Sequence, residues 1–553
     1  MSDQKTLSWK IIVQFGLLAG LISLSLGVIG FLALLGNREL IGGWITLGHV
    51  FLIAPAAAFA YLKTEPIHKD HRIQVLGSGM LLALLSSLPL ILLALLASAV
   101  DLRQYLVNVS PELMDLLLFG RGLFPGGLLL VLVMSLTGVL ASGVNLLSDR
   151  IRMPLLTGLG WTLLIATFSE ILSGRLRSFF GHQFVRAVFT RGALNPLVAV
   201  VLFILIAGAK AYQQKRLGED RAERVIDRIP ARVKNGLGVL VLLLLPLFLG
   251  TYLTEVVNNV GLYVLMGLGL NIVVGFAGLL DLGYVAFFAI GAYVMGILTT
   301  EGHLGFAGMT FWTALPFSVL TATLAGIMLG IPVLRMRGDY LAIVTLGFGE
   351  IIRILALSDL LKPYIGGAQG VLQIPKPSIA GFDLVQPEFL FYVILIGVFI
   401  AVFVSWRLRD SRLGRQWMAM REDEDVAEAM GINLVSTKLL AFATGAAFSG
   451  LAGAIFASKL TSIFPHSFNL IVSINVLSLI IVGGIGSLPG VVVGALILVG
   501  LPELLREFAE YRMLMYGALL IVMMLAKPEG FWPSEVRKRE MHAYEESGTP
   551  TAE

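Results

Sequence analysis

Long apolar runs separated by short charged segments make up most of the 553-residue chain. A membrane-spanning helix needs about 20 mostly apolar residues. The first part of the chain contains candidate spans near residues 11–35, 41–62, 74–100, 127–147, 153–174 and 192–212. The second part contains runs near residues 236–254, 257–279, 284–300, 312–334, 340–357, 388–406, 438–458, 470–485, 490–507 and 511–527. The pattern predicts an all-α, polytopic membrane bundle of roughly 14–16 hydrophobic segments, some of them re-entrant.

The composition supports a membrane protein, because 57% of the residues are hydrophobic, 14% are charged and the mean hydropathy is +0.87. The chain has no cysteine, which excludes disulfides, thiolate metal sites and cysteine nucleophiles. The net charge of +4 is carried by loops, so it indicates membrane topology and not nucleic-acid binding. The apolar run after Lys10 is too long for a signal peptide, and we expect a retained first span.

A charged segment divides the chain into two long apolar regions. We predict an N-terminal transmembrane extension at 1–209, a cytoplasmic linker at 210–235, a core at 236–533 and a polar cytoplasmic tail at 534–553. Cytoplasmic loops of membrane proteins are enriched in Lys and Arg. Alternation of the spans places several basic clusters on this same side, namely Lys210–Lys234, Arg335/Arg337, Arg407–Arg421 and Arg537–Arg539. Both termini are therefore predicted to be cytoplasmic, although a loop at Arg175–Arg191 contradicts the rule.

The polar loop Trp406–Thr437 is the longest charged interruption in the second region. Asp425 and Glu428 resemble a capping arrangement, and Gly431 is a typical helix stop. The intervening residues Val426, Ala427, Ala429 and Met430 would allow another surface to approach closely. The pattern predicts a short helix outside the bilayer that another protein contacts. A solvated loop whose arginines only set the orientation is the alternative.

Polar residues also occur inside the apolar runs. The glycine-rich stretch Gly267–Tyr284 contains Asn271 and Asp281 at or near membrane depth. Irregular backbone is tolerated there only beside protein or a water-filled cavity, and intramembrane ionisable residues are functional candidates. The alternative is that Asp281 lies at the boundary and caps the next span.

A second group of polar residues follows Asp339, which we expect to be the N-cap of a helix. Glu350 and Arg353 are three residues apart, so they can form an ion pair on one face that avoids lipid. A glycine-rich turn, Gly366-Gly367-Ala368-Gln369-Gly370, comes next and is predicted to lie outside.

Small residues repeat every four positions at Ala441, Gly445, Ser449, Gly453 and Ala457, and again at Gly486, Gly490 and Gly494. Such a stripe favours close helix packing. The sequence contains no P-loop, HExxH or G-x-S-x-G pattern, and its seven histidines are scattered. We therefore expect no enzymatic activity, no bound metal and no cofactor in this chain.

Several blocks resemble one family of membrane proteins. Asp425-Val426-Ala427 followed by Gly431 resembles the EAA motif of ABC importer permeases. Longer blocks at 267–293, 338–355 and 501–530 resemble the LivM-type permease subunit of branched-chain amino-acid ABC importers. The resemblance covers most of residues 236–533, and the six N-terminal spans resemble an extension that some members carry.

The resemblance implies an importer in the bacterial inner membrane. A periplasmic amino-acid-binding protein would deliver leucine, isoleucine or valine to this chain and a second, LivH-like permease subunit. Two ABC ATPase subunits, LivG/LivF-like, would use ATP and grip the coupling residues Asp425, Val426, Ala427, Glu428 and Gly431. The residues expected along the translocation path are Asn271, Asp281, Tyr284, Glu350, Arg353, Gly366, Gly367 and Gln369.

Two alternatives to a branched-chain amino-acid importer stay open. A permease for urea or short amides would share this architecture. A membrane enzyme or receptor would place its site in the N-terminal spans, and it would need titratable groups that converge there.

Overall fold

The computed structural model describes residues 9–43, 45–65, 71–190, 192–227, 231–334, 336, 338–379 and 381–504. Between 505 and 533 it describes only residues 514, 517, 520, 521, 523, 525, 527 and 529–533. The basic residues Lys5, Arg335, Arg337 and Arg537–Arg539, the side chains of 215–235, most of 505–528 and the tail 534–553 lie outside the described residues. The predictions made for them are therefore carried by the sequence alone.

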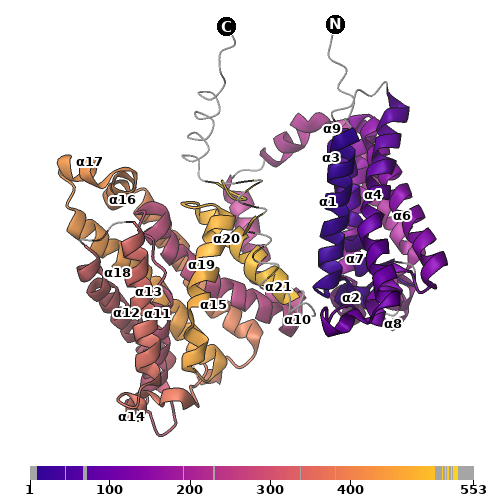
Figure 1. Ribbon diagram of the computed structural model, residues 1–553. Helices are drawn as coiled ribbons and strands as arrows, with labels where there is room; N and C mark the ends of the chain where they lie inside the picture. The colour runs from indigo at the N-terminus through magenta and orange to yellow at the C-terminus, as the bar shows by residue number, and fades with distance from the viewer. Residues whose placement is uncertain are drawn as a thin grey trace. The chain divides into compact units, whose positions relative to one another are not determined.

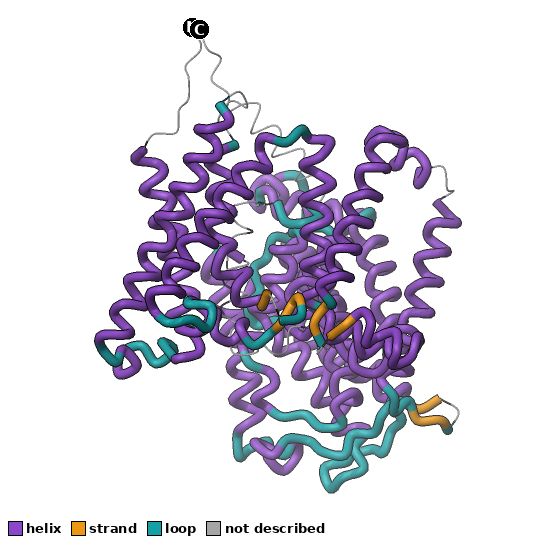
Figure 2. Tube along the Cα trace, turned by 90° about the vertical axis from the view of Figure 1, so that its right-hand side faces the viewer, coloured by secondary structure: helices purple, strands orange, loops and turns teal. Residues whose placement is uncertain are grey.

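Helices make up most of the described chain, and the strands are a few short segments (Figure 2). Among the described residues, 10 helices are long and apolar enough to cross a membrane, or 11 if one bent pair forms a single span. The predicted all-α, polytopic bundle is confirmed.

The helices are fewer than the hydrophobic runs for identifiable reasons. The runs near 236–254 and 257–279 form one long helix that breaks at Gly250, where φ is 62°. The run near 284–300 forms a helix of only 15 residues. The runs near 470–485 and 490–507 form the bent pair, whose angle is 119°.

The chain divides into two compact units, Met1–Asn235 and Gly236–Glu553, which we describe separately as unit 1 and unit 2. Unit 1 contains the helices α1 (Trp9–Val28), α2 (Phe31–Gly36), α3 (Leu47–Thr64), α4 (Arg72–Ala99), α5 (Pro111–Leu117), α6 (Leu123–Leu146), α7 (Asp149–Thr167), α8 (Ser169–Val188) and α9 (Pro196–Asp227), with a 3₁₀ turn at Leu102–Gln104. Its strands are β1 (Glu39–Ile41), β2 (Ile45–Thr46), β3 (Phe189–Thr190) and β4 (Ala193–Leu194), in the order β2-β1-β4-β3.

Unit 1 is a bundle in which α1, α3, α4 and α6 lie side by side (Figure 1). Glycines allow the helices to approach, since a Cβ on Gly79 would lie 2.7 Å from the carbonyl oxygen of Gly138. The prediction of a loop at Arg175–Arg191 is wrong for most of that segment. It belongs to α8, which has a non-helical residue at Gly181 and exposes Phe180 and Phe184.

Unit 2 contains most of α10 (Ala231–Leu270), followed by the π-helical turn η2 (Asn271–Phe276), α11 (Val285–Thr299), α12 (Phe311–Val333), α13 (Asp339–Leu357), α14 (Lys362–Ile365), the 3₁₀ turn η3 (Gly367–Gln369), α15 (Pro387–Arg409), α16 (Arg412–Glu422), α17 (Glu424–Ala429), α18 (Leu434–Leu460), the 3₁₀ turn η4 (Pro465–Phe468), α19 (Leu470–Gly483), α20 (Leu488–Ala495), the π-helical turn η5 (Leu496–Gly500) and α21 (Leu501–Leu504). The strands β5 (Ser378–Ile379) and β6 (Phe382–Asp383) form a short antiparallel hairpin.

Helix α18 lies at the centre of unit 2 and packs against α11 and α12. The five small residues predicted to share a face of this helix are all buried, namely Ala441, Gly445, Ser449, Gly453 and Ala457. A Cβ on Gly453 would overlap the carbonyl oxygen of Phe288 in α11, so only glycine permits this contact. The prediction of close helix packing is confirmed.

The glycines of the second series, Gly486, Gly490 and Gly494, do not all lie on one helix face as predicted. Gly490 and Gly494 in α20 contact the backbone of α19, where they allow the two helices of the bent pair to touch. Gly486 is not on that helix face. It lies in the turn between α19 and α20 with φ at 80°.

Candidate functional site

The polar loop Trp406–Thr437 folds into two short helices, α16 and α17. Asp423 separates them with an extended backbone and caps α17, because its Oδ1 accepts hydrogen bonds from the amides of Asp425 at 2.9 Å and Val426 at 3.0 Å. The expectation that Asp425 provides the cap is wrong. Asp425 lies inside the first turn, where its charge still favours the positive helix end.

The end of α17 matches the prediction. The amide of Gly431 donates to the carbonyl of Glu428 at 2.9 Å, and the amide of Ile432 donates to that of Ala427 at 3.1 Å. This pair of bonds is a Schellman motif, which requires a left-handed residue, and Gly431 has φ at 86°. Gly431 as the helix stop is confirmed.

The exposed face of α17 differs from the expected one. Ala427 is 3% exposed and packs into the core of unit 2, so the expectation that it offers a contact surface is wrong. Val426 and Met430 are 58% and 80% exposed and lie four residues apart. Asp425 and Glu428 are exposed beside them. The surface open to another protein is thus an apolar pair with an acidic rim.

Buried contacts fix the polar loop to the start of α18. The indole of Trp417 is fully buried, and its Nε1 donates to the carbonyl of Thr437 at 2.9 Å. The ammonium of Lys438 pairs with Glu424 at 2.9 Å, and these side chains are 2% and 19% exposed. The loop is therefore a packed element of unit 2 and not a free hydrophilic connection.

The candidate path residue Asn271 begins the π-helical turn η2. Its side chain is buried, and its Oδ1 accepts a hydrogen bond from the amide of Gly486 at 2.8 Å. Gly275 lies beside this contact, since a Cβ there would be 2.8 Å from the same amide. The guanidinium of Arg421, from the polar loop, donates a hydrogen bond to the carbonyl of Gly275 at 2.9 Å. Single π turns are rare and are frequent at functional sites.

Asp281 lies in the loop between η2 and α11. It is fully buried, and its Oδ1 accepts a hydrogen bond from the amide of Gly283 at 2.9 Å. The neighbouring amide of Leu282 donates to Thr345 of α13 at 3.0 Å. Because α11 begins only at Val285, Asp281 organises this loop and does not cap the next span. Its place on the translocation path stays a prediction.

Tyr284 is packed between helices. Its hydroxyl donates to the carbonyl of Gly445 at 2.8 Å, and Ser449 donates to the carbonyl of Tyr284 at 3.3 Å. A Cβ on Gly269 would overlap the same hydroxyl. Tyr284 thus joins the start of α11 to α18, and any contact with a transported molecule stays a prediction.

Glu350 and Arg353 form the predicted ion pair on α13, with both Nε and Nη2 of the guanidinium 2.8 Å from Oε2. Their side chains are 34% and 32% exposed, so within this chain the pair is only partly covered. The helix begins at Asp339 after Gly338, whose φ is 57°. The N-cap is Gly338, so the prediction that Asp339 is the N-cap is wrong by one position.

The glycine turn at 366–370 lies at the end of unit 2 opposite α16 and α17, next to α14 (Figure 1). Gly366 and Gly370 have φ at 80° and 66°, Gly367 is buried and Gln369 is exposed. The structure therefore does not bring the predicted site residues together. They fall into four places: the polar loop, the segment around η2, the Glu350–Arg353 pair on α13 and this turn.

Sequence reasoning missed a polar group that joins α10 to α18. Lys459 pairs with Glu255 at 2.7 Å and donates to Asn259. Both charged residues follow the last position of an apolar run, at 254 and at 458, and for that reason were not counted as charges within a span.

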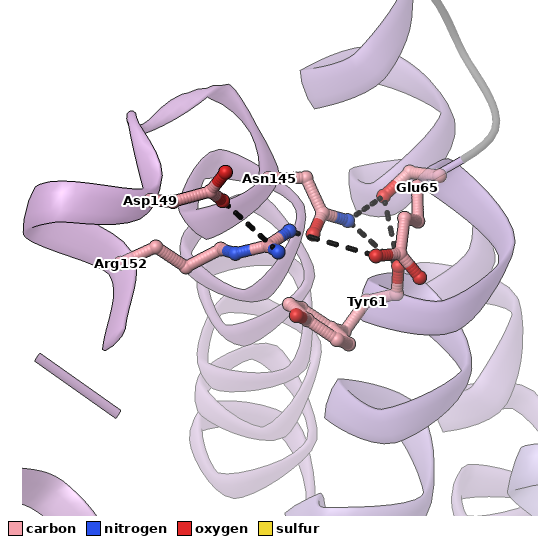
Figure 3. Close-up of polar contacts among 6 residues, drawn as sticks. Tyr61, Glu65, Asn145, Asp149 and Arg152 are labelled. Carbon is pink, nitrogen blue, oxygen red and sulfur yellow. Dashed lines mark hydrogen bonds and ion pairs between the residues drawn. The ribbon is translucent and has the colours of Figure 1, made fainter. Parts of the chain in front are cut away.

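In unit 1, charged groups converge at the end where α3, α6 and α7 meet (Figure 3). Arg152 pairs with Asp149 at 3.1 Å and with Glu65 at 3.5 Å. Asn145 donates to the carbonyl of Tyr61 at 2.7 Å. The two carboxylates are 73% and 51% exposed and already paired, which is typical of a structural tie between helices. No group of metal-binding side chains occurs among the residues that the structure describes.

Comparison with known proteins agrees with this division of the chain. The family model described as branched-chain amino acid transport system / permease component matches residues 252–524, which lie within unit 2. No solved structure matches the chain.

Three curated relatives illustrate the similarity. The chain is 41% identical over 328 residues to the high-affinity branched-chain amino acid transport system permease protein LivM of Escherichia coli K12. The aligned region covers 54% of this chain and 76% of that protein. It is 43% identical over 295 residues to LivM of Salmonella typhimurium, with 49% and 68% covered. It is 26% identical over 305 residues to LivH of Escherichia coli K12, with 50% and 94% covered.

Proposed function

The chain belongs to the family of branched-chain amino-acid transport permeases, and we propose that it is the LivM-type subunit of an ABC importer that moves leucine, isoleucine and valine into the cytoplasm. The observation that carries the proposal is the 41% identity that extends over 76% of a LivM protein. It is supported by a helical membrane unit that carries a capped, solvent-facing helix in the polar loop.

The assembly we propose contains four partner subunits of three kinds. A LivH-like permease subunit completes the pathway, two LivG/LivF-like ATPases supply the energy and a periplasmic amino-acid-binding protein delivers the substrate. ATP is used by the ATPases, since the sequence of this chain contains no P-loop pattern. We expect this chain to bind no cofactor of its own. The protein resides in the bacterial inner membrane.

The ATPase contact is the exposed pair Val426 and Met430 with its acidic rim of Asp425 and Glu428. An apolar pair on a short helix can insert into a groove of a partner, and buried apolar anchors dominate such contacts. Asp423, Ala427 and Gly431 fix the helix without touching the partner. In this proposal the polar loop and both termini face the cytoplasm.

The translocation path runs beside the segment around η2. Asn271 and Asp281 are buried polar groups between apolar helices, and such groups mark substrate pathways in membrane proteins. Glu350, Arg353 and the glycine turn with Gly366, Gly367 and Gln369 form the part of the path that lies nearer the periplasm.

Uptake by cells tests the proposal. The chain is expressed with its partner subunits in a bacterial strain that lacks high-affinity branched-chain uptake, and labelled leucine is measured. We expect uptake that depends on this chain and is reduced by unlabelled isoleucine and valine. A strain with all partners but without this chain is the control. Competition by urea or acetamide, with no effect of isoleucine, would replace the proposal with the short-amide alternative.

A further inference from the structure

Arg421, in the last turn of α16, joins the polar loop to the membrane part of unit 2. Its Nη1 donates to the carbonyl oxygen of Gly275 at 2.9 Å, and its Nη2 pairs with Glu422 at 3.0 Å. The side chain is 29% exposed, so most of it is covered by the protein.

The aliphatic part of this side chain packs on the backbone just after η2. Gly278 has φ at 71°, and a Cβ there would lie 2.5 Å from Cγ and 3.2 Å from Cα of Arg421. Any other residue at 278 would displace the arginine. Arg421 thus contacts the segment twice, through its guanidinium and through its stem.

The carbonyl of Gly275 lies in the last turn of η2, which ends at Phe276. Downstream, the amide of Ala277 donates to Ile272 at 3.0 Å and that of Leu279 donates to Val273 at 2.9 Å. These bonds use earlier carbonyls, and the last turn of a helix leaves carbonyls without helical donors. The guanidinium of Arg421 supplies a charge-assisted donor, which is stronger than a neutral one.

The other side of η2 is tied to the bent pair α19–α20 through the hydrogen bond from Gly486 to Asn271. The π-helical turn is therefore held between the polar loop and the turn of the bent pair. Both hydrogen bonds connect residues far apart in the sequence, so they depend on the packing of the helices.

An open pocket of about 790 Å³ lies beside this connection. Its lining includes Gly275, Phe276, Arg421, Gly486, Trp532 and Pro533. Packed interiors leave little room for movement, whereas the end of α16 and η2 border this open pocket and are not enclosed on that side.

We propose that Arg421 is the positioning residue through which movement of the polar loop reaches the π-helical turn and the bent pair. The proposal rests on the proposed function, since it requires a partner that moves Val426 and Met430. Trp417 of α16 and Glu424 of α17 are both held by the start of α18, so α16 and α17 are coupled through α18 and a displacement of α17 carries Arg421 with it. The turn follows because the carbonyl of Gly275, near its end, is held by that side chain.

The test compares three variants in the complete transporter, reconstituted in liposomes with its binding protein, ATP and labelled leucine. Arg421→Met keeps the stem and removes the donors, while Arg421→Lys keeps the charge. Arg415→Met is the matched control, because Arg415 is exposed on the same helix and donates to the carbonyl of Asp410 within the polar loop at 3.0 Å. ATP hydrolysis and leucine uptake are both measured.

We expect Arg421→Met to retain the ATPase subunits and ATP hydrolysis, and to move about tenfold less leucine per ATP, the effect of one charge-assisted hydrogen bond. Arg421→Lys should recover part of the loss, and Arg415→Met should match the wild type. Gly278→Ala leaves the guanidinium intact and displaces the stem, so it should lower the same ratio. This variant provides the measurement if Arg421→Met is not inserted.

An unchanged ratio in Arg421→Met and Gly278→Ala would overturn the proposal. A parallel loss of ATPase binding and uptake would also overturn it, because Arg421 would then only hold the loop in place. If the wild-type transporter itself shows no leucine uptake, the proposed function fails, and this outcome is distinct from a failure of Arg421.

Discussion

Lys459 of α18 and Glu255 of α10 form an ion pair, 2.7 Å between Nζ and Oε1, whose members differ widely in exposure. The lysine side chain is 5% exposed and the glutamate side chain is 42% exposed. Asn259 also accepts from the ammonium. A buried cation at the end of the central helix therefore depends on a carboxylate that reaches the surface.

This asymmetry predicts that Glu255→Gln destabilises the protein more than Lys459→Met does. Loss of the carboxylate leaves a buried charge, and leaving one charge of a buried pair unpaired costs about 3–5 kcal/mol. Loss of the lysine leaves a carboxylate that water can solvate. Thermal unfolding of the purified protein in detergent measures the difference. The double variant is the control and should unfold at a higher temperature than Glu255→Gln. A larger loss in Lys459→Met would contradict the prediction.

The polar loop gives a second prediction. Val426→Asp should leave the protein folded and inserted but prevent association with the ATPase subunits, because it places a charge on the exposed apolar pair. Ala427→Arg should instead lower the amount of folded protein, since Ala427 is buried in the core. Co-purification of the ATPase subunits and the amount of inserted protein are measured together.

Val435→Asp serves as the control for that experiment. Val435 is 49% exposed in the first turn of α18, outside α17. It should retain the ATPase subunits. Normal association of Val426→Asp, or normal folding of Ala427→Arg, would show that the assigned contact face is wrong.

The orientation of unit 2 can be checked with single cysteines, because the chain has none of its own. Arg415→Cys and Tyr364→Cys are suitable positions, since both side chains are exposed. The two residues belong to α16 and α14, which lie at opposite ends of the unit (Figure 1). Gly414 is unsuitable, because its added Cβ would overlap the carbonyls of Leu408 and Arg409.

With the polar loop in the cytoplasm, an impermeant thiol reagent added to intact cells should label Tyr364→Cys and spare Arg415→Cys. Permeabilised cells provide the control, in which both positions should react. Labelling of Arg415→Cys in intact cells would reverse the topology that was derived from the basic clusters.

The sequence predicted the features that depend on neighbouring residues. The stop at Gly431, the small face of α18 and the pairing of Glu350 with Arg353 each follow from spacing along one helix. The cap of α17 was misplaced because four acidic residues in succession, 422 to 425, can each accept the hydrogen bond. Local pattern selects the motif but not the residue within it.

Features that depend on contacts between distant residues could not be predicted from the sequence. A helix of six residues can turn either face to the core, so the burial of Ala427 and the exposure of Val426 could not be distinguished. The hydrogen bond between Asn271 and Gly486 spans 215 residues, and that between Arg421 and Gly275 spans 146. Such contacts are set by packing, and no local spacing predicts them.

The Glu350–Arg353 pair provides the last prediction. The helix continues past Gly349 to Leu357, so the charges do not lie beyond its end. Ile351 and Ile354 beside them are 55% and 57% exposed, which indicates a lipid or protein environment for this stretch of α13. A lone charge at the centre of a span costs about 2.5–3.5 kcal/mol on insertion scales.

Glu350→Gln or Arg353→Gln alone should therefore lower the amount of inserted protein and leucine uptake. The exchange of Glu350→Arg with Arg353→Glu should recover part of the loss, because it restores two opposite charges on one face. Asp383→Asn, exposed on the β5–β6 hairpin, is the control and should have no effect. An exposed ion pair in water stabilises a protein by less than about 1 kcal/mol. If the single variants alter neither insertion nor uptake, the pair lies at an aqueous surface and the prediction is wrong.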